Sequence, residues 1–453
     1  MLTNIKKFES KAAYEIYRAT DGWDYPAVNL IDDGNCREVH YNNEFIMRWY
    51  DEDLVKVPSF FGDVSWEEFK NWVDNASRPC EVPVNTTITP AEIKYLNPED
   101  LDEREDGTTS KFSDPLNFTW YQMAEIKNIN VGLFENSSEG WKEVRFNFDK
   151  GCPKGFHKWF PNAPSGKKLW GRYDAVYLSP DEQYSCCKGN LIGASWTPNS
   201  NFSYMNAAED NLLSLTYWEY HVLVFIFCAY YKTFDVQSVC DGLCWYDDND
   251  GSDSFYSLRR SYQTGWIDSQ VSGHAGKHIY GNYSSASGHS NEAYKFMWLE
   301  NPLHGMSYIY TAGCCNLDPY IYYCFDDIKA NVAVSLYSDR EYADLAIPHF
   351  TLPSPIEFCD PEDSFYYLTL YGIPCHKQYP RNGGRVELTS SQGFYDWSYL
   401  SQNIVANQIT CVGGYYEETA GGFCRNFSTF SKSSPGDNIR YRITMNISPG
   451  SIS

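Results

Sequence analysis

Residues 411–443 read CVGGYYEETAGGFCRNFSTFSKSSPGDNIRYRI, and the interpretation of the chain starts from them. Their glycines favour backbone with φ > 0 or a close approach between chain segments. The residues between the glycines follow neither the 3.6-residue period of a helix nor a clean strand alternation. Rigid aromatics mixed with adaptable polar groups are typical of a binding loop held by a scaffold. An ordinary surface loop followed by a last strand, 439–443, is the alternative that local composition leaves open.

The composition of the chain limits its architecture and its partners. A chain of 453 residues is expected to hold two or three domains and to bury a large core. The net charge of -23 would repel phosphates, so we expect no nucleic-acid binding. Aromatic residues make up 17% of the chain, which favours recognition surfaces and β-rich cores. Charged residues, at 21%, are too few to favour long amphipathic bundles.

Cysteine usage and hydropathy predict the compartment. The 15 cysteines are odd in number and scattered, without a C-x-x-C pair, which disfavours a zinc ribbon. We expect most of them to be thiols of a protein made in a reducing cytosol. The start of the chain lacks an apolar secretory segment. The longest apolar run, Val222 to Ala229, is far below the roughly 20 residues that cross a bilayer, so no membrane insertion is expected.

The first part of the chain is predicted to contain two units. Residues 1–110 form an α+β or β-rich N-terminal attachment domain, with short strands at 29–33 and 37–41 and a helix that follows a capping box at Ser65. The acidic run 98–107 is predicted to be a solvated linker. Residues 111–150 form a connecting β-rich segment, with strands near 130–134 and 144–148.

From about residue 151 the sequence changes to turn-and-strand phrases with large aromatics. Thr216 and Glu219 form a second capping box, which predicts a helix that runs to about Lys232. This helix is apolar on nearly all sides, so we expect it to be buried in a core. The phrase Glu300-Asn301-Pro302, with Gly305, is followed further along the chain by Tyr320-Ile-Tyr-Tyr-Cys324.

The order of these phrases resembles one group of proteins. A Gly-Gly pair, an aromatic, freely varied residues, Ala420-Gly421, Phe423, a Ser/Asn-rich run and Ile439 to Ile443 resemble the variable region of phage and prophage proteins diversified by retroelements. Those proteins carry a C-type-lectin-like domain of the formylglycine-generating-enzyme type. The opening of the chain also resembles gut-phage tail-tip proteins.

The resemblance implies an α+β fold in which residues 151–445 form a C-type-lectin-like ligand-display domain and 446–453 a tail. Such a domain pairs its N- and C-terminal strands, so 439–443 would join the sheet and hold the variable loop at one end. Arg442 would then serve the structure by pairing with a carboxylate. Gly413, Gly414 and Gly421 would likewise belong to the scaffold.

The function implied by the resemblance is that of a phage tail-fibre or tail-tip adhesin that binds a host cell-surface protein or glycan. Other tail proteins would bind the N-terminal domain, and a homotrimer is compatible with this role. The protein would be made in the bacterial cytoplasm and carried on the virion, exposed to the medium. The expected contact residues are Tyr395, Trp397, Tyr399, Tyr415, Tyr416, Glu417, Glu418, Thr419, Arg425, Asn426 and Phe427.

Diversification by a retroelement has its own requirement. Replacement of adenines turns an Asn codon into codons for Tyr, Ser, Asp, Cys or Phe without reaching a stop codon. Tyr415, Tyr416, Cys424 and Phe427 fall inside that set. The hypothesis requires a near-copy of the coding segment for about 395–442 in the same genome, beside a reverse transcriptase gene.

Two other functions remain as alternatives. The enzyme branch of the resembled fold modifies sulfatases with a cysteine pair, and Cys411 and Cys424 flank the variable loop. No Lys or His cluster lies beside either cysteine in the sequence to activate a thiol, and no hydrolase, dinucleotide or phosphate-loop motif occurs. The acidic run 247–253 does not fit an EF-hand loop. We therefore expect no enzyme, no cofactor and no metal, and a structural virion protein without its own receptor is the other alternative.

Overall fold

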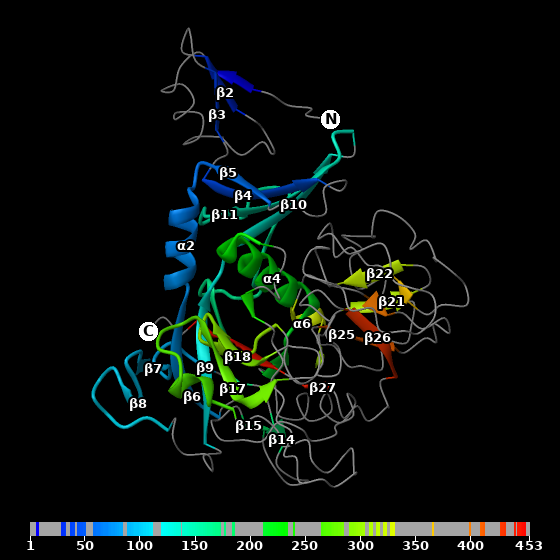
Figure 1. Ribbon diagram of the computed structural model, residues 1–453. Coiled ribbons are helices and arrows are strands. Elements are labelled where there is room, and N and C mark those ends of the chain that lie inside the picture. Colours follow the sequence, from blue (N-terminus) through cyan, green and yellow to red (C-terminus); the bar gives the residue numbers. More distant parts are fainter. Residues whose placement is uncertain are drawn as a thin grey trace.

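The computed structural model is mainly β-sheet with few helices (Figure 1). It describes residues 6–8, 29–32, 37–40, 43–50, 58–84, 88–111, 119–136, 138–173, 176–177, 184–185, 212–233, 239–240, 264–284, 290–303, 308–310, 314–317, 320–323, 327–330, 365–366, 398–399, 408–412, 426–431, 439–440 and 442–449. The described helices are α2 (Trp66–Asn75), α4 (Tyr217–Tyr231), α6 (Asp327–Ala330) and the 3-10 helix η1 (Ile267–Ser269).

A seven-stranded antiparallel sheet gathers strands from both ends of the chain. Its order is β16 (Leu212–Ser214), β28 (Ile443–Asn446), β13 (Lys167–Gly171), β9 (Trp120–Lys127), β6 (Ser77–Pro83), β7 (Lys94–Asn97) and β8 (Asp100–Arg104). The last described strand therefore lies beside β13, more than half of the chain away in sequence.

A five-stranded antiparallel sheet forms the second layer. Its order is β12 (Phe156–Lys158), β10 (Asn130–Asn136), β11 (Trp141–Asn147), β4 (Glu44–Tyr50) and β5 (Ser59–Gly62). At the end of β5, Gly62 has a φ of 123°, and a Cβ there would lie 2.1 Å from the carbonyl oxygen of Glu44. Only glycine fits this close approach of β5 to β4.

One six-stranded sheet and four groups of two or three strands complete the described sheets. They are β1 (Lys6–Phe8) with β2 (Asn29–Asp32) and β3 (Arg37–His40); β14 (Val176–Tyr177) with β15 (Tyr184–Ser185); β17 (Gly276–Ser284) with β18 (Ser290–Phe296) and β19 (Leu299–Glu300); and β21 (Cys314–Leu317) with β22 (Tyr320–Tyr323). A six-stranded sheet joins β23 (Phe365–Tyr366), β24 (Ser398–Tyr399), β26 (Asn426–Ser431), β25 (Gln408–Val412), β20 (Tyr308–Tyr310) and β27 (Ile439–Arg440).

The core lies around α4, which Figure 1 shows between α2 and the six-stranded sheet. Every residue of α4 from Tyr217 to Ala229 is buried, which confirms the expectation of a helix that is apolar on all sides. Both predicted capping boxes are present, at Ser65 before α2 and at Thr216 before α4. The indole of Trp66 donates a 3.0 Å hydrogen bond to the carbonyl oxygen of Ala229, which joins the two helices.

Several strand predictions are confirmed, and one local prediction is wrong. The expected strands at 29–33 and 37–41 are present as the antiparallel pair β2 and β3, and those near 130–134 and 144–148 as β10 and β11. The acidic run 98–107 is not a linker, because β8 lies within it and pairs with β7. The expected boundary near residue 110 falls inside shared sheets, since β6 pairs with β9 and β4 with β11.

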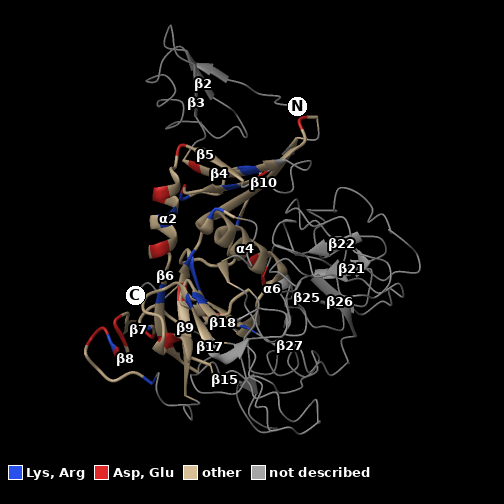
Figure 2. Ribbon diagram, in the orientation of Figure 1, with Lys and Arg blue, Asp and Glu red and all other residues tan. Residues whose placement is uncertain are grey.

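Acidic residues gather in two described elements. Figure 2 shows Asp and Glu positions along α2 and around β8. Exposed carboxylates there keep their charge in water at little cost, which suits a solvated face. No helix in the described part of the chain has the length and apolar character that a membrane crossing needs.

Candidate functional site

The six-stranded sheet carries the described part of the expected contact surface, and we call it the binding sheet. In it, β24 and β26 run parallel, with Tyr399 opposite Phe427 and Ser398 opposite Asn426. The two expected contact patches, one near 395–399 and one near 425–427, therefore meet on neighbouring strands. Sequence separation alone did not require this meeting.

Three of the expected contact residues, Tyr399, Asn426 and Phe427, lie in described strands. Asn426 and Phe427, expected on a loop, lie in the first two positions of strand β26. The others lie outside the described residues, and they are Tyr395, Trp397, Tyr415, Tyr416, Glu417, Glu418, Thr419 and Arg425. Their role stays a prediction.

The frame of the expected variable loop is an antiparallel strand pair. β25 ends at Val412, β26 begins at Asn426, and these two residues lie opposite each other in the register. The chain between them therefore leaves and returns at adjacent points of one sheet. Hydrogen bonds along β25 and β26 hold both ends of the expected variable loop.

The end of the chain reaches the core through two strands instead of one. The expected strand 439–443 is divided: β27 pairs in parallel with β20 in the binding sheet, while β28 begins at Ile443 in the seven-stranded sheet. Arg442 precedes β28 at this change of sheet. Of the described residues of the expected strand, only Ile443 belongs to the seven-stranded sheet, and Ile439–Arg440 belong to a different sheet.

Arg442 is buried, with 1% of its surface exposed. Its Nη1 donates to the carbonyl oxygens of Gly171 and Arg172, at 2.6 and 3.0 Å, and its Nη2 donates to that of Glu300 at 2.7 Å. The structural role expected for this residue is supported by these three contacts, in which main-chain carbonyl oxygens accept from the buried guanidinium. A pairing of Arg442 with a carboxylate stays a prediction.

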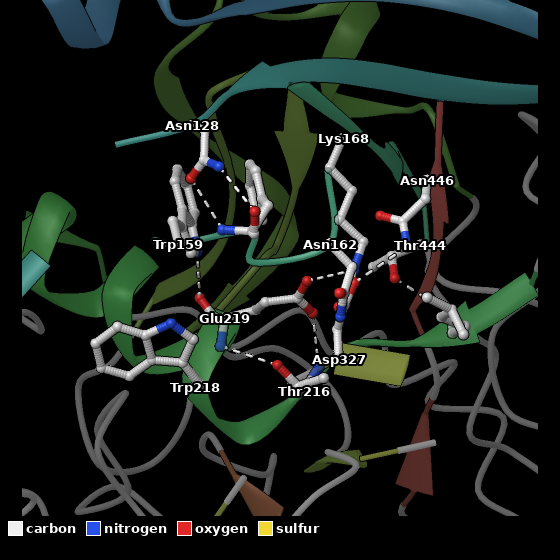
Figure 3. A network of polar contacts seen from close by, with 12 residues as sticks. Asn128, Trp159, Asn162, Lys168, Thr216, Trp218, Glu219, Asp327, Thr444 and Asn446 are labelled. Carbon is white, nitrogen blue, oxygen red and sulfur yellow. Dashed lines mark hydrogen bonds and ion pairs between the residues drawn. The ribbon is translucent and has the colours of Figure 1, made fainter. Parts of the chain in front are cut away.

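A buried charge network connects α4, α6 and two strands of the seven-stranded sheet (Figure 3). Lys168 of β13 places its Nζ 2.5 Å from Oε1 of Glu219 and 2.5 Å from Oδ2 of Asp327. Asn162 donates to Asp327 Oδ1 at 2.7 Å, and Asn446 of β28 donates to Oδ2 at 3.3 Å. The network therefore fixes α6, which follows the β21–β22 pair, onto the core.

The electrostatics of this network favour a charged lysine. Burial disfavours its charge, but the two adjacent carboxylates outweigh burial and raise the pKa of Lys168. Burial raises the pKa of Glu219. At Asp327, burial acts in the same direction, but the charge of Lys168 and the hydrogen bonds to the carboxylate outweigh it and lower the pKa of Asp327. One cation thus stands between two carboxylates, and removing it would leave both without their counter-charge.

A second buried network lies at the other end of β13. Arg172 places its Nη2 2.7 Å from Oδ1 of Asp268, and the Tyr173 hydroxyl donates to Oδ2 at 2.7 Å. Lys295 of β18 lies 3.2 Å from the same Oδ1. Asp268 belongs to η1, so this carboxylate links η1 and β18 to the end of β13.

A further buried carboxylate, Glu44 at the start of β4, has its Oε2 3.6 Å from Nη1 of Arg145. The pKa of the Glu44 carboxyl is raised to about 8. Burial is the main cause, and together with the surrounding carboxylates it outweighs the attraction of Arg145. The folded protein therefore binds a proton here at neutral pH that the unfolded chain releases.

Glu44→Gln is expected to flatten the pH dependence of stability. Because the folded pKa of about 8 exceeds the ordinary value of 4.5, the contribution of Glu44 is full below pH 4.5 and is lost as pH rises through 8. Between about pH 5 and about pH 9 the wild type should lose on the order of 2–4 kcal/mol more than the variant. Urea unfolding at both pH values measures this, with Glu67→Gln on α2 as the exposed control. An equal loss in wild type and Glu44→Gln would contradict the assignment.

The described residues bear in part on the chemistry of the alternatives. Cys80, Cys228 and Cys240 are buried thiols and Cys152 is an exposed one. Cys411 lies in β25 opposite Phe427, whereas Cys424 and the acidic run 247–253 lie outside the described residues. Among the residues described, no group of three or more His, Cys, Asp or Glu is placed to hold a metal ion.

Sequence reasoning missed the buried charge networks that join α4, α6 and η1 to the sheets of the core. Glu219 was identified as a cap, and its Oε2 does accept the Thr216 amide at 2.9 Å, but its other oxygen binds Lys168. The available signal was a charged residue inside an otherwise apolar helix, as at Glu219. Lys168 follows Lys167 at the start of β13 and carried no such signal. Buried charges of that kind are almost always paired, although the partner cannot be read from spacing.

Comparison with models of protein families found no family that matches this chain, and comparison with curated proteins found no match either. The function therefore has to be inferred from the chain's own residues and geometry.

Proposed function

We propose that this chain is a phage or prophage tail-tip adhesin that binds a host cell-surface protein or glycan through the binding sheet and the loop 413–425. The observation that carries the proposal is the register that sets Tyr399 opposite Phe427 on parallel strands. Two aromatic residues that are distant in sequence therefore occupy paired positions on neighbouring strands. Large, stiff side chains beside an adaptable loop provide contact area at a low entropic cost.

We also propose that residues 151–445 adopt a C-type-lectin-like fold. The antiparallel pairing of β13 with β28 supports it, because these strands lie near the two ends of residues 151–445. The sheet also contains β9, β6, β7 and β8, which come from the preceding part of the chain. The proposed display domain is therefore built against an N-terminal half that shares its sheet.

Charge narrows the proposed ligand. A net charge of -23 disfavours polyanionic surface polymers and favours a protein or a neutral glycan. Contact through aromatic residues fits both, since aromatic rings pack on apolar protein groups and on the apolar faces of sugars.

Changing Tyr399 and Phe427 together to Ala is expected to weaken binding to a susceptible bacterial strain about 30-fold or more, as for the central aromatic residues of an interface. Labelled full-length protein is titrated onto intact cells of a strain panel, and cells treated with protease or with periodate separate a protein ligand from a glycan. The matched control is Trp141→Ala on β11, an aromatic change outside the binding sheet.

Three results would contradict the proposal. Saturable binding that the double variant retains would place the contact surface elsewhere. Absence of saturable binding to every strain would favour the structural virion protein. Copper-dependent turnover of a sulfatase peptide that is lost in Cys411→Ser would favour the enzyme instead.

A further inference from the structure

We propose that Arg442 is a positioning residue that fixes the binding sheet relative to the core. The proposal concerns how the sheet is held, and its meaning for ligand binding rests on the proposed function. The chain enters the binding sheet at β20 and leaves it at β27, and these two strands run side by side in parallel, with Tyr308 opposite Ile439 and Ile309 opposite Arg440.

The outgoing segment is fixed to the core before it reaches β20. The amide of Leu303 donates to the Tyr294 hydroxyl at 2.7 Å, and its carbonyl oxygen accepts from the Tyr220 hydroxyl at 2.7 Å. Earlier in the same segment, the amide of Glu300 donates to the carbonyl oxygen of Arg172 at 2.9 Å. This segment is therefore tied to α4, β18 and the end of β13.

The returning segment is fixed by Arg442, two positions after the last residue of β27. The guanidinium contacts two parts of the chain. Its Nη1 donates to the carbonyl oxygens of Gly171 and Arg172 at the end of β13, and its Nη2 donates to the carbonyl oxygen of Glu300 on the outgoing segment. The carbonyl oxygen of Arg442 accepts from the Leu215 amide at 3.1 Å. One side chain thus joins the outgoing segment, the returning segment and the seven-stranded sheet.

The chemistry of this junction calls for arginine. A planar guanidinium presents donors in divergent, fixed directions, whereas the single ammonium of lysine is a point donor. Lysine at 442 would keep the buried charge and could satisfy one side of the junction, but it could not bridge both. The outgoing and returning segments would then be tied to the core separately, and the orientation of β20 and β27 would loosen.

Hydrogen exchange tests the role of Arg442 apart from general stability. In Arg442→Lys, amides of Tyr308–Tyr310, Gln408–Val412 and Ile439–Arg440 are expected to exchange about tenfold faster than in the wild type, while those of Ser77–Pro83 and Trp120–Lys127 change less than about twofold. Thr444→Val in β28 is the matched control, since it removes only the 3.5 Å hydrogen bond to the Leu213 carbonyl oxygen. Thr444→Val is expected to leave unchanged the ratio of amide exchange rates between the binding sheet and the seven-stranded sheet.

Two outcomes would overturn the proposal: equal acceleration in both sheets, which marks an ordinary stability contribution, or no acceleration in the binding sheet. If Arg442→Lys does not fold, Arg442→Gln, which buries no charge, is measured under the same criterion. Cell binding is recorded in parallel. Selective loosening together with lost binding supports both proposals, whereas selective loosening in a protein that binds no strain supports the positioning role and counts against the proposed function.

Discussion

Lys168→Met is expected to lower the free energy of unfolding by about 3–5 kcal/mol, because it leaves Glu219 and Asp327 buried without their counter-charge. All three side chains are buried. The loss should fall first on α6, which the network holds against β13 and β28. Urea unfolding followed by fluorescence and by far-UV circular dichroism measures the change.

The neighbouring residue in the same strand provides the control for Lys168. Lys167 pairs with Glu125 at 2.7 Å, but its side chain is 37% exposed, so Lys167→Met is expected to cost less than about 1 kcal/mol. Adding Glu219→Gln and Asp327→Asn to Lys168→Met should recover most of the loss, because the buried charges are then absent. A loss below about 1 kcal/mol for Lys168→Met would show that the network does not hold the core.

Removal of residues 1–110 is expected to abolish cooperative unfolding of the rest of the chain. The deletion takes β4 away from β11 and β6 away from β9, which opens both large sheets along a central strand. It also removes α2, whose Phe69 belongs to the buried core around α4. The free energy lost with these strand pairings and core contacts is expected to exceed the roughly 5–15 kcal/mol by which a domain is stable.

Thermal unfolding of three chains tests this expectation. The fragment 43–453 is the control, because among the described strands β1, β2 and β3 pair only with one another. It should unfold cooperatively, as the full chain does, whereas 111–453 should show no cooperative transition. If 111–453 melts within about 5 °C of the full chain, the first 110 residues form a separate domain as the sequence predicts.

Local signals explain which elements could be predicted. The capping boxes at Ser65 and Thr216 lie within four residues of the groups that they satisfy, so their sequence spacing specifies both helix starts. The apolar run of α4 predicted burial because it leaves no polar face to meet water. Short alternating runs likewise predicted β10 and β11.

Elements held by distant contacts could not be predicted in the same way. Met297 and Trp298 form the two-residue turn between β18 and β19 with φ values of 52° and 63°. Such a turn ordinarily requires Asn or Gly, and neither residue here carries that signal. The amide of Trp298 donates to the His274 carbonyl oxygen at 3.0 Å, and Arg172 donates to the Trp298 carbonyl oxygen at 3.1 Å. Tertiary contacts hold a conformation that the local sequence disfavours.

The same division applies to the candidate site. Composition, the capped helices and the short strands follow from residues that interact with near neighbours, and these features could be inferred from the order of amino acids. The meeting of Tyr399 with Phe427, the pairing of Lys168 with Asp327 and the role of Arg442 each join residues far apart in the chain. Strand partners are selected by burial of whole faces and by neutralisation of buried charge, which are properties of the assembled core and leave no fixed spacing in the sequence.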